Sequence, residues 1–296
     1  MSYYTRLNRS FEGALRLPLN YCSKYILISD CHRGSGTSND NFLKNQNLYT
    51  AALQYYFRAG YTYIELGDGD ELWENRDMRQ IIEAHQNVFR LLSRFRECNK
   101  LYMLYGNHDI IKKDNRYVAK NCSVYPCYMD NPLMESLPLL PDMTFYEGII
   151  LENQSSPEAR DIYLTHGHQT DLFNSTLWRL SRFLVRHLWK PLERYGVLDP
   201  TSAAKNYTRK HKAEQRLHHW AKQENHILIT GHTHRPTLSE DDSYYYNSGS
   251  CIHPGSITCL EIDHMHIRLV KWTLNTRMDM TLYVEREVMA DDIRLQ

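Results

Sequence analysis

No stretch of the 296-residue chain approaches the roughly 18 consecutive apolar residues that a membrane-spanning helix needs. Residues 1–20 alternate charged and apolar side chains, so they also lack the continuous apolar segment of a signal peptide. These two absences predict a cytoplasmic protein without a transmembrane segment. The same sequence leaves its oligomeric state open.

Cysteine is sparse, and charge of either sign is not in excess. The seven cysteines are an odd number at irregular spacings, which fits neither a disulfide framework nor a paired zinc-binding motif. Lysine plus arginine equals aspartate plus glutamate at 35 each, so the chain lacks the positive field of a general nucleic-acid binder. The 42% of hydrophobic residues is typical of a globular protein with a sizeable core.

Five short segments rich in β-branched and aromatic residues predict buried strands, and a polar cluster follows each of them. The segments are residues 25–29, 61–66, 101–105, 162–165 and 227–230. The clusters are Asp30-Cys31-His32, Gly67-Asp68, Gly106-Asn107-His108-Asp109, His166-Gly167-His168 and Gly231-His232-Thr233-His234. Apolar stripes of helical period lie between the first three strands, at residues 43–55 and 81–95. They indicate an α/β protein with parallel pairing, in which the clusters converge beyond the carboxyl ends of the strands.

The rest of the chain predicts one long helical segment and a group of later strands. Residues 172–224 form a two-helix insertion, broken near residues 196–200, with Thr201 or Ser202 as the N-cap of its second helix. Residues 244–246, 257–262 and 266–272 predict strands of a second, more antiparallel sheet packed on the first. We expect residues 1–296 to form a single domain with the insertion within it.

The polar clusters hold the ligand types of a divalent metal ion. Alternate residues of an extended segment share a face, so Asp30 and His32 can hold one ion together, and His232 and His234 repeat this spacing. The carboxylate of Asp68 has two oxygens and can bridge two ions. Adding Asn107 and His166 gives a ligand set that suits two metals better than one.

Taken in order, these five motifs resemble the calcineurin-like metallophosphoesterases, and the resemblance spans residues 30–234. It implies a two-sheet β-sandwich flanked by helices. It places Asp30, His32 and His234 on the first metal, Asn107, His166 and His232 on the second, and Asp68 between them. It also implies attack by a metal-bridging hydroxide, with His108 protonating the leaving oxygen or stabilising charge and Asp109 orienting His108.

A narrower resemblance points to one branch of that family. Residues 67–73, Gly231-His232-Thr233-His234-Arg235-Pro236 and residues 247–250 are similar to the UDP-2,3-diacylglucosamine hydrolases. The sequence departs from that branch at His108, where those hydrolases carry arginine, and in its extra length before His166 and in the insertion. The substrate is therefore left open between monoesters, diesters and diphosphates.

The insertion has a strong local charge. Its 11 basic residues against four acidic ones give +7, and aromatic residues are interleaved with them. One hypothesis is a cap that attracts an anionic substrate, with Arg179, Arg182 and Arg186 as contacts. The alternative is a solvated helical face with packed tryptophans, and contact with a membrane surface also stays open. Further candidates for substrate contact are Arg33, Glu71 and His168, the last of which could equally support the metal ligands.

The sequence therefore predicts a phosphoesterase or pyrophosphatase with two divalent ions that acts on a small or lipid-linked phosphate compound. Mn²⁺ is the first choice of metal, because mixed oxygen and imidazole ligands suit it, with iron, zinc and cobalt as alternatives. One rival function is a metal-dependent nuclease, against which the balanced charge argues. The other is a non-catalytic metal-binding scaffold, against which the complete ligand set and His108 argue.

Overall fold

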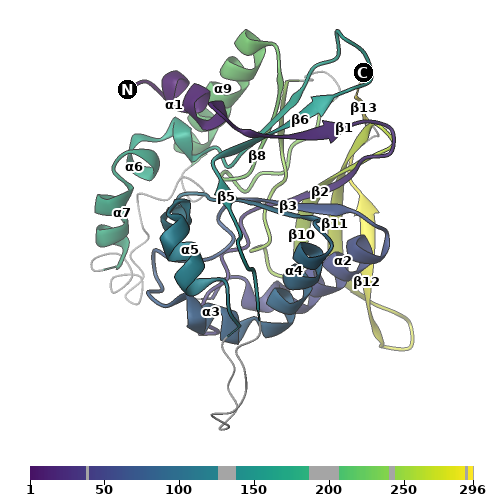
Figure 1. Ribbon diagram of the computed structural model, residues 1–296. Helices are drawn as coiled ribbons and strands as arrows, with labels where there is room; N and C mark the ends of the chain where they lie inside the picture. The colour runs from purple at the N-terminus through teal and green to yellow at the C-terminus, as the bar shows by residue number, and fades with distance from the viewer. Residues whose placement is uncertain (38–39, 126–137, 187–206, 240–243, 291–292, 296) are drawn as a thin grey trace.

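Two β-sheets pack face to face in the computed structural model, and helices cover their outer faces (Figure 1). The structure describes residues 1–37, 40–125, 138–186, 207–239, 244–290 and 293–295. Within these residues, the larger sheet runs in the order β12 (Leu282–Val288), β11 (His266–Thr276), β10 (Ser256–Asp263), β2 (Lys24–Ile28), β3 (Thr62–Leu66), β4 (Leu101–Leu104) and β5 (Phe145–Tyr146), with β13 (Ile293–Arg294) paired to β11. The smaller sheet runs β1 (Leu15–Leu19), β6 (Gly148–Asn153), β7 (Ile162–Thr165), β8 (Ile227–Thr230) and β9 (Tyr245–Asn247).

Helices lie on both outer faces of this sandwich. On the larger sheet lie α2 (Gln46–Arg58), α3 (Met78–Ala84), α4 (Gln86–Glu97) and α5 (Asn115–Asn121), with the short 3₁₀ turns η1 (Leu43–Asn45) and η2 (Ile110–Lys113). On the smaller sheet lie α1 (Tyr3–Phe11) and α9 (Tyr207–Glu224), while η3 (His168–Thr170), α6 (Leu172–Ser175) and α7 (Trp178–Leu184) follow β7. The described helices hold no segment long and apolar enough to cross a bilayer.

Successive side chains of the strands point alternately into the core between the two sheets and into the cores between each sheet and its covering helices. Side chains such as Leu27, Ile64, Leu164 and Ile229 fill the space between the sheets and are fully buried. Their neighbours along each strand face the opposite way, because successive side chains of a strand point to opposite faces. A strand with both faces covered by apolar layers has no polar face, which explains the continuous apolar runs in the sequence.

The five predicted strands and the two-sheet fold are confirmed, with boundaries shifted by about one residue. The apolar stripe predicted over residues 81–95 is two helices rather than one. They meet at His85, whose ring lies 2.7 Å from Gln46 Oε1 and 2.8 Å from Asp40 Oδ2. The insertion holds α6, α7 and α9, whereas the predicted break and the N-cap at Thr201 or Ser202 lie outside the described residues.

The predicted second, antiparallel sheet made of the later strands is wrong. β10 and β11 extend the larger sheet, since β10 pairs antiparallel with β2, and only β9 joins the smaller sheet. The smaller sheet is mostly parallel, with one antiparallel pair, β6 and β7. Periodicity in the sequence predicts a strand but does not show which strand will be its neighbour. The pairing of β10 with β2 could therefore not be predicted from the pattern.

Leu27→Ala should lower the free energy of unfolding by about 2–5 kcal/mol, because it leaves a cavity between the sheets. Urea denaturation measures this change. Leu282→Ala is the matched control, since Leu282 is 69% exposed, and it should change stability by less than about 0.5 kcal/mol. Equal losses in both variants would contradict the packing described here.

Candidate metal centre

All five polar clusters lie beyond the carboxyl ends of their strands, β2, β3, β4, β7 and β8, which come from both sheets. The first three strands are parallel neighbours in the larger sheet, and β7 and β8 are parallel neighbours in the smaller one. The two sheets thereby present their clusters to one another at the same edge of the sandwich. The predicted convergence is thus produced by two sheets rather than by one.

The backbone at the clusters has an unusual conformation. Eleven described non-glycine residues have a φ between 49° and 68°, the left-handed region that costs most side chains free energy. Five of them lie in the clusters: Asp30, His32, Asp68, His232 and His234. All five are among the seven predicted metal ligands. Strained backbone of this kind gathers at functional sites, where the surrounding structure holds it in place.

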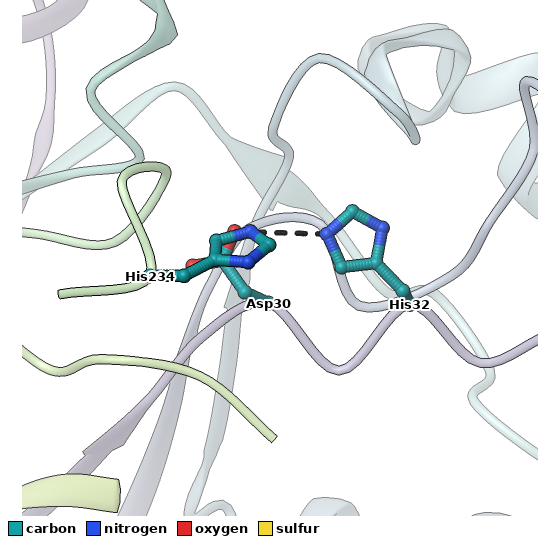
Figure 2. Close-up of side chains that lie close together, drawn as sticks. All are labelled: Asp30, His32 and His234. Atoms are coloured by element: carbon teal, nitrogen blue, oxygen red, sulfur yellow. Dashed lines mark ion pairs between the residues drawn. The ribbon is translucent and has the colours of Figure 1, made fainter. Parts of the chain in front are cut away.

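The first group of ligands joins the loop after β2 to the loop after β8. Asp30 Oδ1 lies 2.9 Å from His234 Nε2 and 3.7 Å from His32 Nε2. Figure 2 shows both imidazole rings pointing toward the carboxylate of Asp30. The donor atoms of these three residues all lie within 4.8 Å of one another, which is a separation that one metal ion can span.

The second group joins the smaller sheet to the loop after β3. It consists of Asp68, His166 and His232, whose donor atoms also lie within 4.8 Å of one another. Asp68 Oδ2 is 3.1 Å from His166 Nε2 and 3.8 Å from His32 Nε2, so the same oxygen faces a histidine of each group. This oxygen therefore lies between the histidines of the two groups.

Each carboxylate is fixed through the oxygen that faces away from the histidines. Asp30 Oδ2 accepts hydrogen bonds from Ser29 Oγ at 2.5 Å and from the backbone N–H of His232 at 2.9 Å. Asp68 Oδ1 accepts one from the backbone N–H of His108 at 2.8 Å. The other oxygen of each side chain is left facing the imidazoles.

Two of the histidines, His166 and His32, are each held through the ring nitrogen Nδ1. His166 Nδ1 donates to the backbone carbonyl of Leu66 at 2.9 Å, and His32 Nδ1 lies 2.9 Å from Glu71 Oε2. A partner on Nδ1 sets the ring orientation and leaves Nε2 as the coordinating atom, which is the usual arrangement of a metal-binding histidine.

Two further buried atoms of the predicted metal ligands, Asn107 Oδ1 and His232 Nε2, lack a hydrogen-bond partner among the described residues. Buried polar atoms are nearly always paired, so such atoms need an explanation. A carboxamide oxygen, imidazole nitrogens and carboxylate oxygens form a donor set that suits manganese, iron, cobalt or zinc. The residues present therefore fit divalent metal ions.

The pKa values of the site follow from burial and from the close contacts. Burial alone would raise the pKa of Asp30 and of Asp68, but nearby histidines lower both pKa values well below the ordinary range. Burial lowers the pKa of His232 to about 3, so its ring is neutral at physiological pH and can coordinate through a lone pair. Burial opposes protonation of His166, yet Asp68 and Asp30 raise its pKa to about 9, which shows how strongly these carboxylates attract positive charge.

His108 lies at the edge of the site and packs against Trp73. The two rings are stacked at 4.5 Å and 24°, and His108 Nδ1 is 2.7–2.8 Å from the carboxylate oxygens of Glu71. Burial lowers the pKa of His108, but Glu71 and Asp68 outweigh this effect and raise it. Glu71 therefore contacts His32 and His108 together and holds both rings, while the substrate contact expected for it stays a prediction.

The predicted hydrogen bond from Asp109 to His108 is replaced by other contacts. Asp109 Oδ1 accepts from the backbone N–H groups of Gly106 at 2.7 Å and of Asp68 at 3.3 Å, and Asp109 Oδ2 pairs with Lys112 at 3.0 Å. Asp109 thus ties together the loops that follow β3 and β4. The two residues are neighbours in the sequence, which suggested a hydrogen bond between them, but the side chain of Asp109 has other partners.

Arg33 is also placed differently from its prediction. Its side chain is fully buried, donates to both carboxylate oxygens of Glu65 at 2.8 Å, and donates to Asp70 at 2.6 Å. Arg33 therefore holds the loop after β2 in place, and its enclosed side chain cannot reach a substrate. Lys112 completes the network by pairing with Asp70 and Asp109. Its only signal in the sequence is its position three residues after Asp109.

The three arginines of the insertion that were predicted to contact a substrate have other neighbours within the protein. Arg179 and Arg182 lie over the ring of Trp178 at 5.5 Å and 4.8 Å. Arg186 donates to the backbone carbonyls of Leu72, Trp73 and Asn75, so it anchors the residues just after α7 to the loop that contains Trp73.

His168 lies behind the metal ligands. Its ring centroid is 5.6 Å from that of His166, the side chain is buried, and burial holds its pKa well below the usual value. A neutral ring packed beside His166 fits the supporting role that the sequence left open for it.

The family model described as calcineurin-like phosphoesterase matches residues 23–236, which hold every ligand and supporting residue described above. The chain belongs to this family. Membership of this family supports a metal-dependent phosphoesterase activity, and the clustered aspartates and histidines agree with it. No curated protein matches the sequence.

Solved structures resemble the chain at low identity. Vps29 from Chaetomium thermophilum has 12% identity and a TM-score of 0.41, covering 92% of this chain and 95% of its own. A mutant cold-active protein tyrosine phosphatase has 14% identity and a TM-score of 0.40, covering 91% of this chain and 83% of its own. Similarity at this level bears on neither the activity nor the partners of this member of the family.

Gly106→Ala should strongly weaken metal binding, because a Cβ at this position would lie 2.2 Å from Asp68 Oδ1 and 2.7 Å from the backbone nitrogen of Asp68. Metal content per chain, measured after dialysis by atomic spectroscopy, reports the effect. Gly13→Ala is the control, since its Cβ would meet no atom within 4 Å, although its φ of 70° also strains the backbone. If Gly106→Ala retained its full metal content, the close approach of Gly106 to Asp68 would be unimportant.

Proposed function

We propose that the protein is a dinuclear metal-dependent phosphoesterase or pyrophosphatase. The observation that carries this proposal is the common orientation of the buried donors. Asp30 and Asp68 each keep one oxygen in protein hydrogen bonds and turn the other toward imidazole nitrogens. A purely structural cluster would pair these atoms within the protein, whereas Asn107 Oδ1 and His232 Nε2 have no such partner among the described residues.

The division of ligands between two ions is supported by the position of Asp68, which belongs to the second group and also faces His32 of the first. Asp30, His32 and His234 would hold one ion, and Asn107, His166 and His232 would hold the other. Asp68 would bridge them, because Asp68 Oδ2 faces His166 and His32. Mn²⁺ is our first choice for both positions, given the mixture of oxygen and imidazole donors.

When bound, two divalent ions activate water and neutralise negative charge on a transferring phosphoryl group. The chain supplies the proton for the leaving oxygen. Glu71 holds Nδ1 of His108, and its charge, with that of Asp68, raises the His108 pKa and favours the protonated ring. Trp73 stacks on the ring and limits its rotation, so Nε2 would be presented toward a substrate.

Asp68→Ala should abolish tight binding of both ions, because it removes the oxygen shared between the two ligand groups. Calorimetric titration with Mn²⁺ measures stoichiometry and affinity, with two ions per chain expected for the unaltered protein. Asp279→Ala removes an exposed aspartate and should bind as the unaltered protein does. A stoichiometry of one ion in the unaltered protein would overturn the dinuclear proposal.

His108→Gln should retain both metals and lower kcat by roughly 10²–10⁴-fold, because it removes the proton donor and leaves the ligands in place. Turnover is measured with Mn²⁺ on a panel of phosphate monoesters, diesters, nucleoside diphosphate sugars and single-stranded DNA. His264→Gln, which changes a half-exposed histidine beside Asp263, is the control. Cleavage of DNA alone would favour a nuclease, and no turnover by the fully metallated protein would favour a scaffold.

A further inference from the structure

A cavity of about 250 Å³ lies beside the metal centre and includes His232 in its lining. Its walls come from the insertion between β7 and β8. Leu172 and Phe173 of α6 form an apolar wall, and Arg209, Lys212 and Arg216 of α9 contribute cationic side chains. Since a water molecule occupies about 30 Å³ of liquid, this space corresponds to roughly eight waters, which is enough for a phosphate group and a few methylenes.

The three basic residues form one stripe along α9. Positions 209, 212 and 216 are separated by three and four residues, so their side chains share a face of the helix. Arg216 is held in place, donating to the backbone carbonyl of Thr170 at 2.7 Å and lying 5.2 Å from the ring centre of Tyr3. Lys212 and Arg209 are exposed, so they can reach toward a bound molecule.

The acidic residue in this lining does not neutralise the stripe. Asp171 is the N-cap of α6 and accepts from the backbone N–H of Phe173 at 2.9 Å and from Asn174 Nδ2 at 3.3 Å. Three cations therefore face one carboxylate that is already engaged, and the lining carries a net positive charge. Leu172 and Phe173 remain 45% and 44% exposed, so the apolar wall is free to contact a ligand.

We infer that this cavity is a second anion subsite of the same active centre. Its ligand is a phosphate ester or diphosphate whose non-reacting part carries a second phosphate, joined to the first by a short apolar segment or an anhydride bridge. The inference rests on the proposed function for the placement of the first phosphate at the metals. The second phosphate binds the stripe of Arg209, Lys212 and Arg216, and the apolar segment lies on Leu172 and Phe173.

This assignment differs from the cap predicted from the sequence. Arg179 and Arg182 lie over Trp178, and Arg186 holds the loop of residues 72–75, so these three cations have other contacts. The basic residues that share a cavity with a metal ligand are those of α9. The positive charge of the insertion that would contact a ligand therefore comes from α9.

The test compares the binding of hexylphosphonate and hexane diphosphonate to the protein loaded with Mn²⁺, by calorimetry. Neither compound contains a hydrolysable ester, and the two differ only in the second anionic group. We expect the diphosphonate to bind about tenfold more tightly, and we expect this ratio to fall toward one in the double variant Arg209→Gln/Lys212→Gln. The ratio should also shrink as salt is added, since exposed charges are screened.

Lys222→Gln is the matched control, because it removes an exposed cation from the same helix outside the cavity lining and should keep the ratio. A ratio near one in the unaltered protein, or an unchanged ratio in the double variant, would overturn the subsite. Binding is measured without turnover, so a lack of activity on the substrate panel would refute the proposed function and leave this result standing.

Discussion

Two carboxylates buried at the meeting point of the sheets are the constraint on which the site depends. Asp30 is fully buried and Asp68 is 2% exposed, and a buried carboxylate that lacks a cation is strongly unfavourable. The surrounding histidines compensate the negative charge of the carboxylates only in part, because burial lowers the pKa of His232 and His234 and favours their neutral forms. Divalent ions satisfy the same negative charge with neutral imidazoles as ligands, so the electrostatics and the donor geometry favour the same occupant.

A second buried network holds the ligand loops in their strained conformation. Arg33 follows directly after His32 in the chain and is fixed by Glu65 and Asp70, while Asp109 binds the backbone N–H groups at Gly106 and Asp68. These contacts set the backbone at positions where a positive φ would otherwise relax. Buried ion pairs of this kind contribute little net stability, and their value here is that they fix one geometry for the ligands.

The sequence located the side chains of the predicted ligand set, because each of them lies close after the end of an apolar strand. The run before Asp68 and the run before His166 each end where a loop must begin, so local pattern alone locates them. It could not show that β3 and β7 belong to different sheets, because pairing depends on contacts far along the chain. The partner of His108 was missed for the same reason: Glu71 lies 37 residues away, whereas Asp109 is its neighbour.

The loops of the larger sheet and the segment between β7 and β8 of the smaller sheet differ in how they are held around the site. The loops after β2, β3 and β4 are tied together by Arg33, Asp109 and Glu71, so their geometry is shared. In the described part of the segment between β7 and β8, Leu172 and Phe173 are exposed beside the α9 cations. Changes in this insertion can alter what lies beside the metals without moving His166 or His232, so substrate choice can change there while the metal centre stays fixed.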